Sequence, residues 1–289
     1  MRADDRHHVA GREGREPEIS IVIPAYNEIR RLPATLRQIL DYMDRAEWCG
    51  EVIVSDDGST DGTEQMVGRE FPECRMVRSQ NNAGKGNAVR QGMLAARGRL
   101  RLFTDADLST PIDELEGLVG AMEAGRWDVA IASRALPGSR LVVPQPWWRE
   151  MSGRMFNAVL QPMSGLRFKD TQCGFKLFRR EAAEAIFSRQ QSTGWAFDVE
   201  VLMIARALGL RVGEHPVRWM NNEASKVSLV RDAPRMLRDI LIFRCRQISG
   251  RYTKRSRRMD GPLKSVRRID AEEAGGEPGP DLKEERGDQ

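Results

Sequence analysis

The chain has 289 residues, of which 40% are hydrophobic, and this is enough to bury the core of one large domain or two small ones. Charged residues make up 30%, and no run of about 20 apolar residues occurs, which excludes a membrane-spanning helix. The net charge of +4 is too small to indicate a nucleic-acid partner, and we expect none.

The N-terminal segment, residues 1–17, is polar, and we expect it to be flexible. It lacks the apolar core of a signal peptide. The four cysteines lie far apart and form no C-x-x-C pair, which argues against a disulfide-dense secreted scaffold and against a structural zinc site. We therefore expect a cytoplasmic protein with reduced thiols.

From residue 19 to residue 133, short apolar runs alternate with amphipathic stretches. The apolar runs predict strands over residues 19–24, 51–55, 75–78, 100–104 and 128–133. The stretches between them predict helices over about 32–43, after a cap at 59–61, over 86–97 and from about 111 to 124. This alternation is typical of an α/β fold with a doubly wound, mostly parallel sheet, in which ligands bind outside the carboxyl ends of the strands.

Polar side chains follow three of these strands and should meet in one crevice. They are the segment from Pro24 to Glu28, the pair Asp56-Asp57, and Asp105-Ala106-Asp107. An Asp-x-Asp pair can hold a divalent ion on two phosphates, although such pairs are also common in turns. Either Asp56 or Asp57 could accept the N–H of a uracil or guanine base, or merely cap the next helix.

Two basic groups are expected at the same crevice. Gly84-Lys85-Gly86 opens a helix, where backbone N–H groups and a lysine favour an anion, but the Walker A spacing is absent and a plain helix start is the alternative. Arg134 ends the fifth strand, and its guanidinium suits either a phosphate or a surface salt bridge.

In this order, these motifs resemble the inverting family 2 glycosyltransferases of the GT-A fold. Four further motifs are similar to the dolichyl-phosphate β-glucosyltransferase branch, a neighbour of the dolichyl-phosphate mannose synthases: Gly138-Ser-Arg140, Asp170–Phe178, Trp195–Glu200 and Ser225-Lys226. The resemblance covers residues 18–248. It implies one GT-A domain over 18–250, with a nucleotide-sugar half at 18–134 and an acceptor half at 135–250.

The resemblance also implies a role for each matching residue. The donor nucleotide would be bound by Pro24, Ala25, Tyr26, Glu28, Asp56 or Asp57, Gly84, Lys85, Asp105 and Ala106. Asp107 would hold Mg²⁺ or Mn²⁺ on the diphosphate, and Arg134 would face the phosphate or the sugar. Ser109 stands where the mannose synthases carry a metal-binding Gln, and is a weaker ligand that would act through water.

The implied reaction moves a hexose, expected to be glucose from UDP-glucose, to a polyprenyl or dolichyl phosphate. Asp198 would act as general base if the acceptor were a hydroxyl, whereas a lipid phosphate is already ionised and would need Asp198 only to orient the sugar or anchor its loop. Candidates for contact with an acceptor phosphate are Lys176, Arg206 and Lys226. The alternatives are a saccharide or small-molecule acceptor, a GDP-mannose-dependent mannose synthase, and a nucleotide-sugar-binding scaffold without activity.

The C-terminal part has features of a segment that binds a membrane surface. Apolar and arginine residues alternate over 234–247, which indicates a helix that either lies on an anionic bilayer or packs on the core with its charged face in solvent. Trp147-Trp148 suits an interfacial anchor, a lid or a packed loop. Residues 251–289 are basic and then acidic, and we expect them to be disordered. A peripheral position on the cytoplasmic face of a membrane is compatible with these features.

Overall fold

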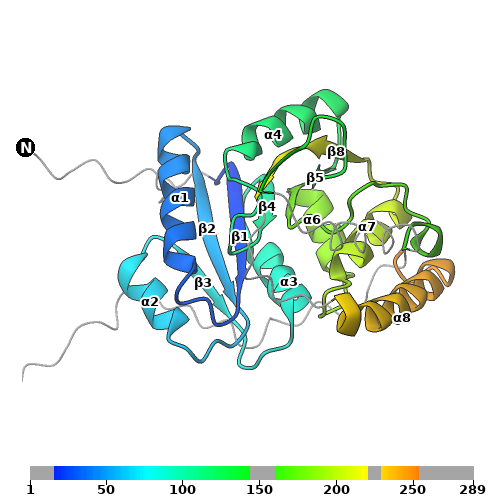
Figure 1. The fold of residues 1–289 in the computed structure, drawn as a ribbon, viewed down its shortest axis with the longest axis horizontal. Coiled ribbons are helices and arrows are strands. Elements are labelled where there is room, and N and C mark those ends of the chain that lie inside the picture. Colours follow the sequence, from blue (N-terminus) through cyan, green and yellow to red (C-terminus); the bar gives the residue numbers. More distant parts are fainter. Residues whose placement is uncertain (1–15, 144–159, 221–228, 254–289) are drawn as a thin grey trace, which may run out of the picture.

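The computed structural model describes residues 16–143, 160–220 and 229–253. A seven-stranded sheet in the order β3-β2-β1-β4-β7-β5-β8 forms its centre (Figure 1). Only β7 runs antiparallel to its neighbours β4 and β5, so the mostly parallel sheet is confirmed. The strands are β1 (Ile19–Ala25), β2 (Gly50–Asp56), β3 (Arg75–Arg78), β4 (Leu100–Thr104), β5 (Val129–Ser133), β7 (Phe175–Arg179) and β8 (Val212–Pro216).

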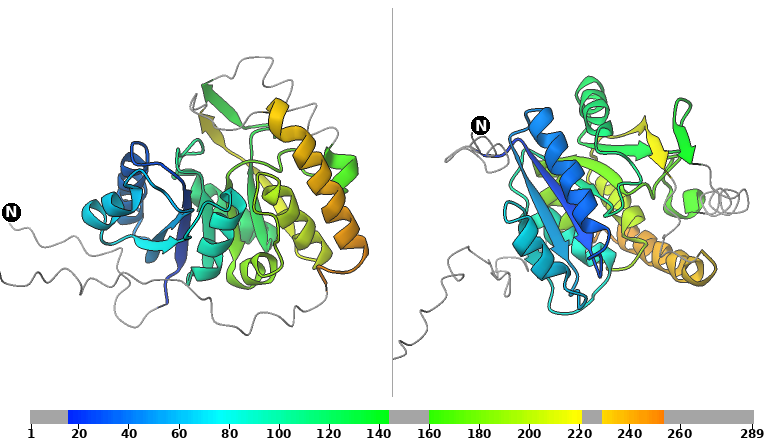
Figure 2. Two further views of the ribbon diagram at one scale, coloured as in Figure 1. Left: turned by 90° about the horizontal axis from the view of Figure 1, so that it is seen from below. Right: turned by 60° about the vertical axis from the view of Figure 1, so that its left-hand side comes forward.

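Helices cover both faces of this sheet. One apolar cluster joins the sheet to α1, α2 and α4, and a second joins it to α3, α6, α7 and α8. The helices are α1 (Leu32–Arg45), α2 (Thr63–Glu70), α3 (Lys85–Ala95), α4 (Glu114–Gly125), α6 (Arg180–Phe187), α7 (Phe197–Ala207) and α8 (Leu229–Ile248). A two-stranded sheet of β6 (Arg140–Val143) and β9 (Arg218–Met220) stands apart from the main sheet (Figure 2).

The predicted strands are confirmed: four are apolar runs that the sheet buries, and β3 is an edge strand in which only Val77 is buried. All seven residues of β1 are buried, as expected of a central strand with helices on both faces. Two helix boundaries differ from the prediction. The helix expected over 86–97 ends at Ala95, because Ala96 adopts an extended conformation. The helix expected directly after a cap at 59–61 begins at Thr63. Of the three predicted cap residues, Asp61 accepts the backbone N–H of Thr63 (3.0 Å).

The carboxyl ends of the parallel strands meet at one edge of the sheet. In the register of β1 and β2, Ala25 lies opposite Asp56, and Val22 lies opposite Phe103 of β4. The three polar segments that follow β1, β2 and β4 therefore converge, as the sequence predicts. The division of the domain at residue 134 stays a prediction.

The helix predicted over 234–247 lies within α8 and packs on α7. Met236, Ile240 and Phe243 are buried, so the core-packing alternative is confirmed for that face. In the described ranges, every helix is too short or too polar to cross a bilayer. The pair Trp147-Trp148, Lys226, the N-terminal segment and the tail from residue 254 lie outside the described residues.

Candidate active site

Lys85 and Asp105 form an ion pair at the carboxyl edge of the sheet. Lys85 is the first residue of α3, and its Nζ lies 2.6 Å from Oδ1 of Asp105, which directly follows β4. The rings of Trp195 and Phe197 flank the ammonium at 5.4 and 5.9 Å. Burial opposes the charge, but the carboxylates of Asp105 and Asp198 outweigh it and raise the pKa of Lys85. The lysine is therefore a fixed cation at neutral pH.

Two glycines allow this pair to form. A Cβ at position 174 would collide with the Asp105 carboxylate, and the carbonyl of Gly174 accepts the Asp105 backbone N–H (3.1 Å). Gly84 has φ of +109°, and a Cβ there would collide with the carbonyl of Thr193. The loop that carries Lys85 thus packs directly on the backbone of the loop before α7.

The two predicted metal ligands lie together. Oδ1 of Asp107 accepts hydrogen bonds from the backbone N–H of Ser109 (3.0 Å) and from its hydroxyl (2.9 Å). Leu108 between them has φ of +44°, a conformation uncommon for leucine. The described residues contain no group of three or more His, Cys, Asp or Glu side chains placed to hold a metal. One carboxylate with a neighbouring hydroxyl still fits Mg²⁺ or Mn²⁺, which proteins often bind through one or two carboxylates plus substrate phosphates.

Asp56 and Asp57 are almost fully buried, and both accept hydrogen bonds from the chain. The backbone N–H of Ser59 donates to Asp56 (3.0 Å). The N–H of Gly84 donates to Asp57 (2.6 Å), which ties the end of β2 to the lysine loop. Contact between either carboxylate and a base stays a prediction.

The segment after β1 supplies a basic residue that the sequence reasoning missed. Pro24 and Ala25 are buried in the sheet, Tyr26 is partly exposed, and Glu28 pairs with Arg31 (2.6 Å). The hydrogen bond that Arg31 donates to Glu28 is the main cause that raises the pKa of Arg31, and the carboxylates of Asp107 and Asp105 add to it. The carboxylates at the predicted metal site therefore stabilise the positive charge of this guanidinium. An arginine one turn after the polar segment was the available signal.

Arg134 makes a two-pronged salt bridge to Asp170. Its Nε and Nη2 lie 2.6 and 2.9 Å from the carboxylate oxygens, and its guanidinium stacks over Trp219. Burial disfavours the charged form of both side chains, but the attraction between the two charges outweighs it. The pKa of Arg134 is therefore raised and that of Asp170 is lowered. Arg134 therefore forms a salt bridge in the structure, and its contact with a phosphate or a sugar stays a prediction.

The candidates for the acceptor phosphate are not brought together. Lys176 is fully buried and donates to Asp198 and to the carbonyl of Cys173 (2.6 Å), so it is not exposed to an acceptor. Arg206 lies in the last turn of α7, about 12 Å along the helix axis from Asp198, and donates to the carbonyl of Gly165. The structure therefore places these two side chains apart, which the sequence did not indicate because a charge in a sequence carries no sign of its burial.

Asp198 lies in the first turn of α7, against the Lys176 ammonium. Burial is the main influence on the carboxyl and raises its pKa, although Lys176 and Lys85 act in the opposite direction. The two ion pairs, Lys176–Asp198 and Lys85–Asp105, thus interact with each other. The lysine ammonium groups lie over the rings of Phe103 and Phe197.

Glu200, two residues further, was also missed. It is fully buried and accepts the N–H groups of Gln191 (2.9 Å) and Ser192 (2.6 Å). The hydroxyl of Tyr252 donates to its other oxygen (2.8 Å). A glutamate inside the apolar run of residues 197–204 was the signal, because a buried carboxylate requires partners.

Comparison with known proteins matches residues 20–187 to the model of the family described as "Glycosyl transferase family 2". The dolichyl-phosphate β-glucosyltransferase of Saccharomyces cerevisiae is 34% identical over 256 residues, which cover 81% of this chain and 76% of the relative. The human protein of that name is 33% identical over 253 residues, with 81% and 77% covered.

Solved structures show the same fold at lower identity. Mannosyl-3-phosphoglycerate synthase from Rubrobacter xylanophilus superposes with a TM-score of 0.60 at 19% identity, covering 85% of this chain and 78% of the other. Glucosyl-3-phosphoglycerate synthase from Mycobacterium tuberculosis, in complex with Mn²⁺, UDP and glucosyl-3-phosphoglycerate, gives 0.58 at 22%, covering 81% and 80%.

Proposed function

The chain belongs to glycosyl transferase family 2, and from this we propose that it transfers glucose from UDP-glucose to a dolichyl or other polyprenyl phosphate, with inversion at the anomeric carbon. The relatives quoted above are named for transfer to dolichyl phosphate. The observation that carries the proposal is the Lys85–Asp105 pair at the sheet edge where Asp107 and Ser109 also converge. A fixed cation next to a carboxylate–hydroxyl pair that can hold a metal ion suits the stabilisation of a departing nucleoside diphosphate.

We assign the donor side to these residues. Asp107, assisted by Ser109, would hold Mg²⁺ or Mn²⁺, which would neutralise the charge that develops on the leaving diphosphate. Lys85 would present its ammonium to the same diphosphate, while Asp105 and two aromatic rings hold the side chain in place. Arg31 adds a second positive charge within the field of both aspartates.

The acceptor decides the role of Asp198. A lipid phosphate carries its own negative charge near pH 7 and needs no base, so Asp198 would keep its ion pair with Lys176 and fix the start of α7. A second candidate, transfer to a saccharide hydroxyl, is favoured by the raised pKa of Asp198, which suits a general base. Loss of transfer with retained donor binding in Asp198→Asn would support the hydroxyl acceptor.

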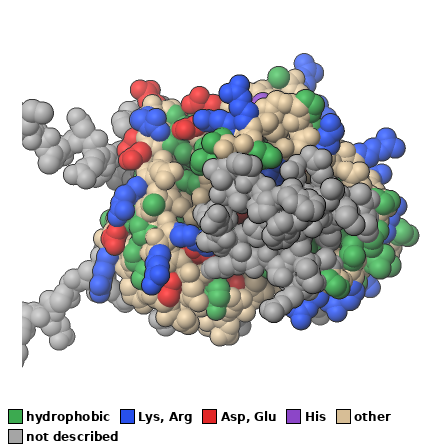
Figure 3. Space-filling model, viewed as in Figure 1, with side chains coloured by type: hydrophobic (Ala, Val, Ile, Leu, Met, Phe, Trp, Pro, Cys, Tyr) green, Lys and Arg blue, Asp and Glu red, His purple; other side chains and the backbone are tan. Residues whose placement is uncertain are grey.

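We further propose that the protein meets its acceptor at the cytoplasmic surface of a membrane. Among the described side chains of α8, the apolar residues Leu241 (54%), Ile242 (40%) and Ile248 (75%) are exposed. Arg235 and Arg238 are exposed on the same helix. Figure 3 shows hydrophobic and basic side chains together at the margin where α8 lies, a combination that suits the interface of an anionic bilayer.

Calorimetry with UDP-glucose and GDP-mannose, each with and without Mn²⁺, tests the donor site first. We expect Mn²⁺-dependent binding of UDP-glucose, weakened about tenfold or more in Asp107→Asn because a carboxylate ligand of the metal is lost. Asp41→Asn, an exposed change on α1, is the matched control and should bind like the unaltered protein. Preference for GDP-mannose would reassign the donor, and binding of neither nucleotide sugar would refute the proposal. Transfer to polyprenyl phosphate but not to free sugars would then establish the acceptor class.

A further inference from the structure

A hollow of about 450 Å³ lies at the far end of α7 from Asp198. The loop from Gly165 to Phe168, the last turn of α7 and the start of β8 surround it. Arg167 and Arg206 project from its wall, and both are exposed. Its position, about 12 Å from Asp198 along α7, separates it from the proposed donor site.

Among the described side chains, the positive charges at this hollow have no acidic partner. Nη1 of Arg206 and Nη1 of Arg244 lie 3.0 and 3.3 Å from the place that a Cβ on Gly165 would occupy, so they are at most about 6 Å apart. Within residues 16–142, 160–220 and 234–253, no carboxylate forms a salt bridge with Arg167, Arg206 or Arg244. Arg206 donates to the Gly165 carbonyl and Arg244 to the side chain of Gln247.

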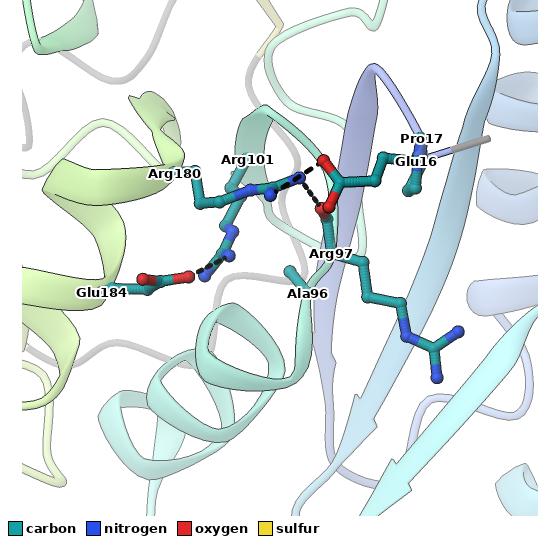
Figure 4. A pocket seen from close by; sticks show the side chains of 7 residues that line it. All are labelled: Glu16, Pro17, Ala96, Arg97, Arg101, Arg180 and Glu184. Atoms are coloured by element: carbon teal, nitrogen blue, oxygen red, sulfur yellow. Dashed lines mark hydrogen bonds and ion pairs between the residues drawn. The ribbon is translucent and has the colours of Figure 1, made fainter.

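A second hollow shows what a balanced arrangement looks like. In the pocket of Figure 4, Arg101 pairs with Glu184 (2.7 Å) and Arg180 with Glu16 (3.0 Å). Each of these two guanidinium groups already has its counter-charge. At the Gly165 hollow the like charges repel one another, and an anion would relieve that repulsion.

The remaining surroundings of the hollow are apolar. Leu166, Phe168 and Leu210 contribute to its wall. On α8, exposed Leu241 and Ile248 precede and follow Arg244 by three and four residues, so all three lie on one face of the helix. Arginines beside exposed aliphatic side chains suit a phosphate group that is attached to an apolar chain.

We propose that this hollow binds the phosphate headgroup of an anionic bilayer lipid and thereby holds α8 against the membrane. The guanidinium groups of Arg206 and Arg244 contact the phosphate, and Arg167 contributes at the rim. Leu241 and Ile248 enter the acyl boundary beside it. The inference deepens the proposed membrane association and rests on it, but it assigns the lipid to a site apart from the acceptor.

Flotation of the full chain with lipid vesicles tests the site. Vesicles of phosphatidylcholine with about 30% phosphatidylglycerol should carry the unaltered protein, and pure phosphatidylcholine should not. Arg206→Gln with Arg244→Gln should lower the partition coefficient about tenfold or more, because two headgroup contacts are lost. The control is Arg45→Gln with Arg69→Gln, which removes the same charge from exposed positions on α1 and α2 and should change binding less than threefold.

Three outcomes of the flotation and phosphate-binding experiments would overturn the proposal. Equal losses in both double variants would mean unspecific attraction, and no loss in either would mean that the hollow binds no lipid. The third outcome comes from calorimetry with inorganic phosphate. If Arg206→Gln with Arg244→Gln abolished tight phosphate binding but left flotation unchanged, the site would bind a free anion and not a lipid. Circular dichroism of each variant checks that the chain is folded.

A transfer assay keeps this proposal apart from the proposed function. In detergent, with a short-chain polyprenyl phosphate, Arg206→Gln with Arg244→Gln should retain the activity of the unaltered protein within about twofold, because no bilayer is present. Loss of activity there would place the hollow in the acceptor site and overturn its separate assignment. Absence of transfer by the unaltered protein would refute the proposed function and leave the flotation result to stand by itself.

Discussion

Single residues at the site owe their positions to contacts that leave no space for larger side chains. Asp105 can face Lys85 because the backbone at Gly174 carries no Cβ beneath its carboxylate. At Gly84, too, there is no space for a side chain, because the lysine loop lies against the carbonyl of Thr193. These glycines are therefore part of the electrostatic arrangement, although neither has a functional group of its own.

Gly174→Ala should displace the Asp105 carboxylate and so disturb the lysine that it holds. We expect kcat/KM for glucosyl transfer to fall about a hundredfold, since a shift of about 1 Å in a positioning group costs that much. The matched control is Gly194→Ala, next to the same site, where a Cβ would meet nothing within 4 Å. Unchanged kinetics in Gly174→Ala, or an equal loss in the control, would show that the close contact has no catalytic consequence.

At the scale of elements, α7 joins the site to the C-terminal part of the described chain. Glu200 accepts hydrogen bonds from the loop before α7 and from Tyr252, and Arg246 of α8 lies 3.3 Å from it. That loop in turn carries Thr193, whose carbonyl accepts the N–H of Gly86 (2.8 Å). A chain of contacts thus runs from α8 to the lysine loop of the donor site.

Tyr252→Phe should weaken this connection without changing the packing of the ring. Burial of the hydroxyl is the main cause that raises the pKa of Tyr252 well above its usual value, and the carboxylate of Glu200 adds to it. Loss of a hydrogen bond to a buried carboxylate should lower the free energy of unfolding by about 1.5–3 kcal/mol, measured by urea denaturation. Tyr42→Phe is the control, because its hydroxyl lies 3.5 Å from Glu116 and should contribute less. Equal effects of the two substitutions would contradict the proposed importance of Glu200.

For the molecule as a whole, the two faces of the sheet have separate apolar clusters, and the one beneath α1, α2 and α4 contains two thiols. Cys74 and Cys173 are buried there and have no described disulfide partner. Burial is the main cause that raises the pKa of Cys74 to about 12 and that of Cys173 to about 11. Both thiols must remain protonated for this cluster to pack.

The stability of the protein should therefore fall in alkaline solution. A thiol whose pKa is raised from 9.0 on folding stabilises fully below pH 9, and its contribution is lost as the pH rises through the folded value. Between pH 9 and pH 11, Cys74→Ala should flatten the decline of the unfolding free energy by up to about 1.4 kcal/mol per pH unit. Urea denaturation at stepped pH measures this slope. Exposed Cys245→Ala should leave the slope unaltered, and an unaltered slope in Cys74→Ala would refute the argument.

Much of the fold follows from local patterns in the sequence. Apolar runs bounded by turn residues predicted β1, β2, β4 and β5 because burial on both faces requires them, and the weaker pattern of residues 75–78 predicted the edge strand β3. Helical spacing predicted α1, α3 and α4. The convergence of Asp56, Asp105 and Asp107 also followed, since parallel strands end at one edge. Antiparallel β7, inserted between β4 and β5, was not predicted, because its neighbours lie 40 or more residues away in the chain and no local pattern specifies them.

The sequence by itself determined the α/β class, the family and the residues that carry charge at the strand ends. Only the tertiary structure decided which charges neutralise one another: Lys85 with Asp105, Arg134 with Asp170, and Lys176 with Asp198. It also removed Lys176 from the surface and placed Arg206 at the far end of α7. The reason is physical, because side-chain type and period are local properties, whereas the burial and the partner of a charge depend on segments that only folding brings together.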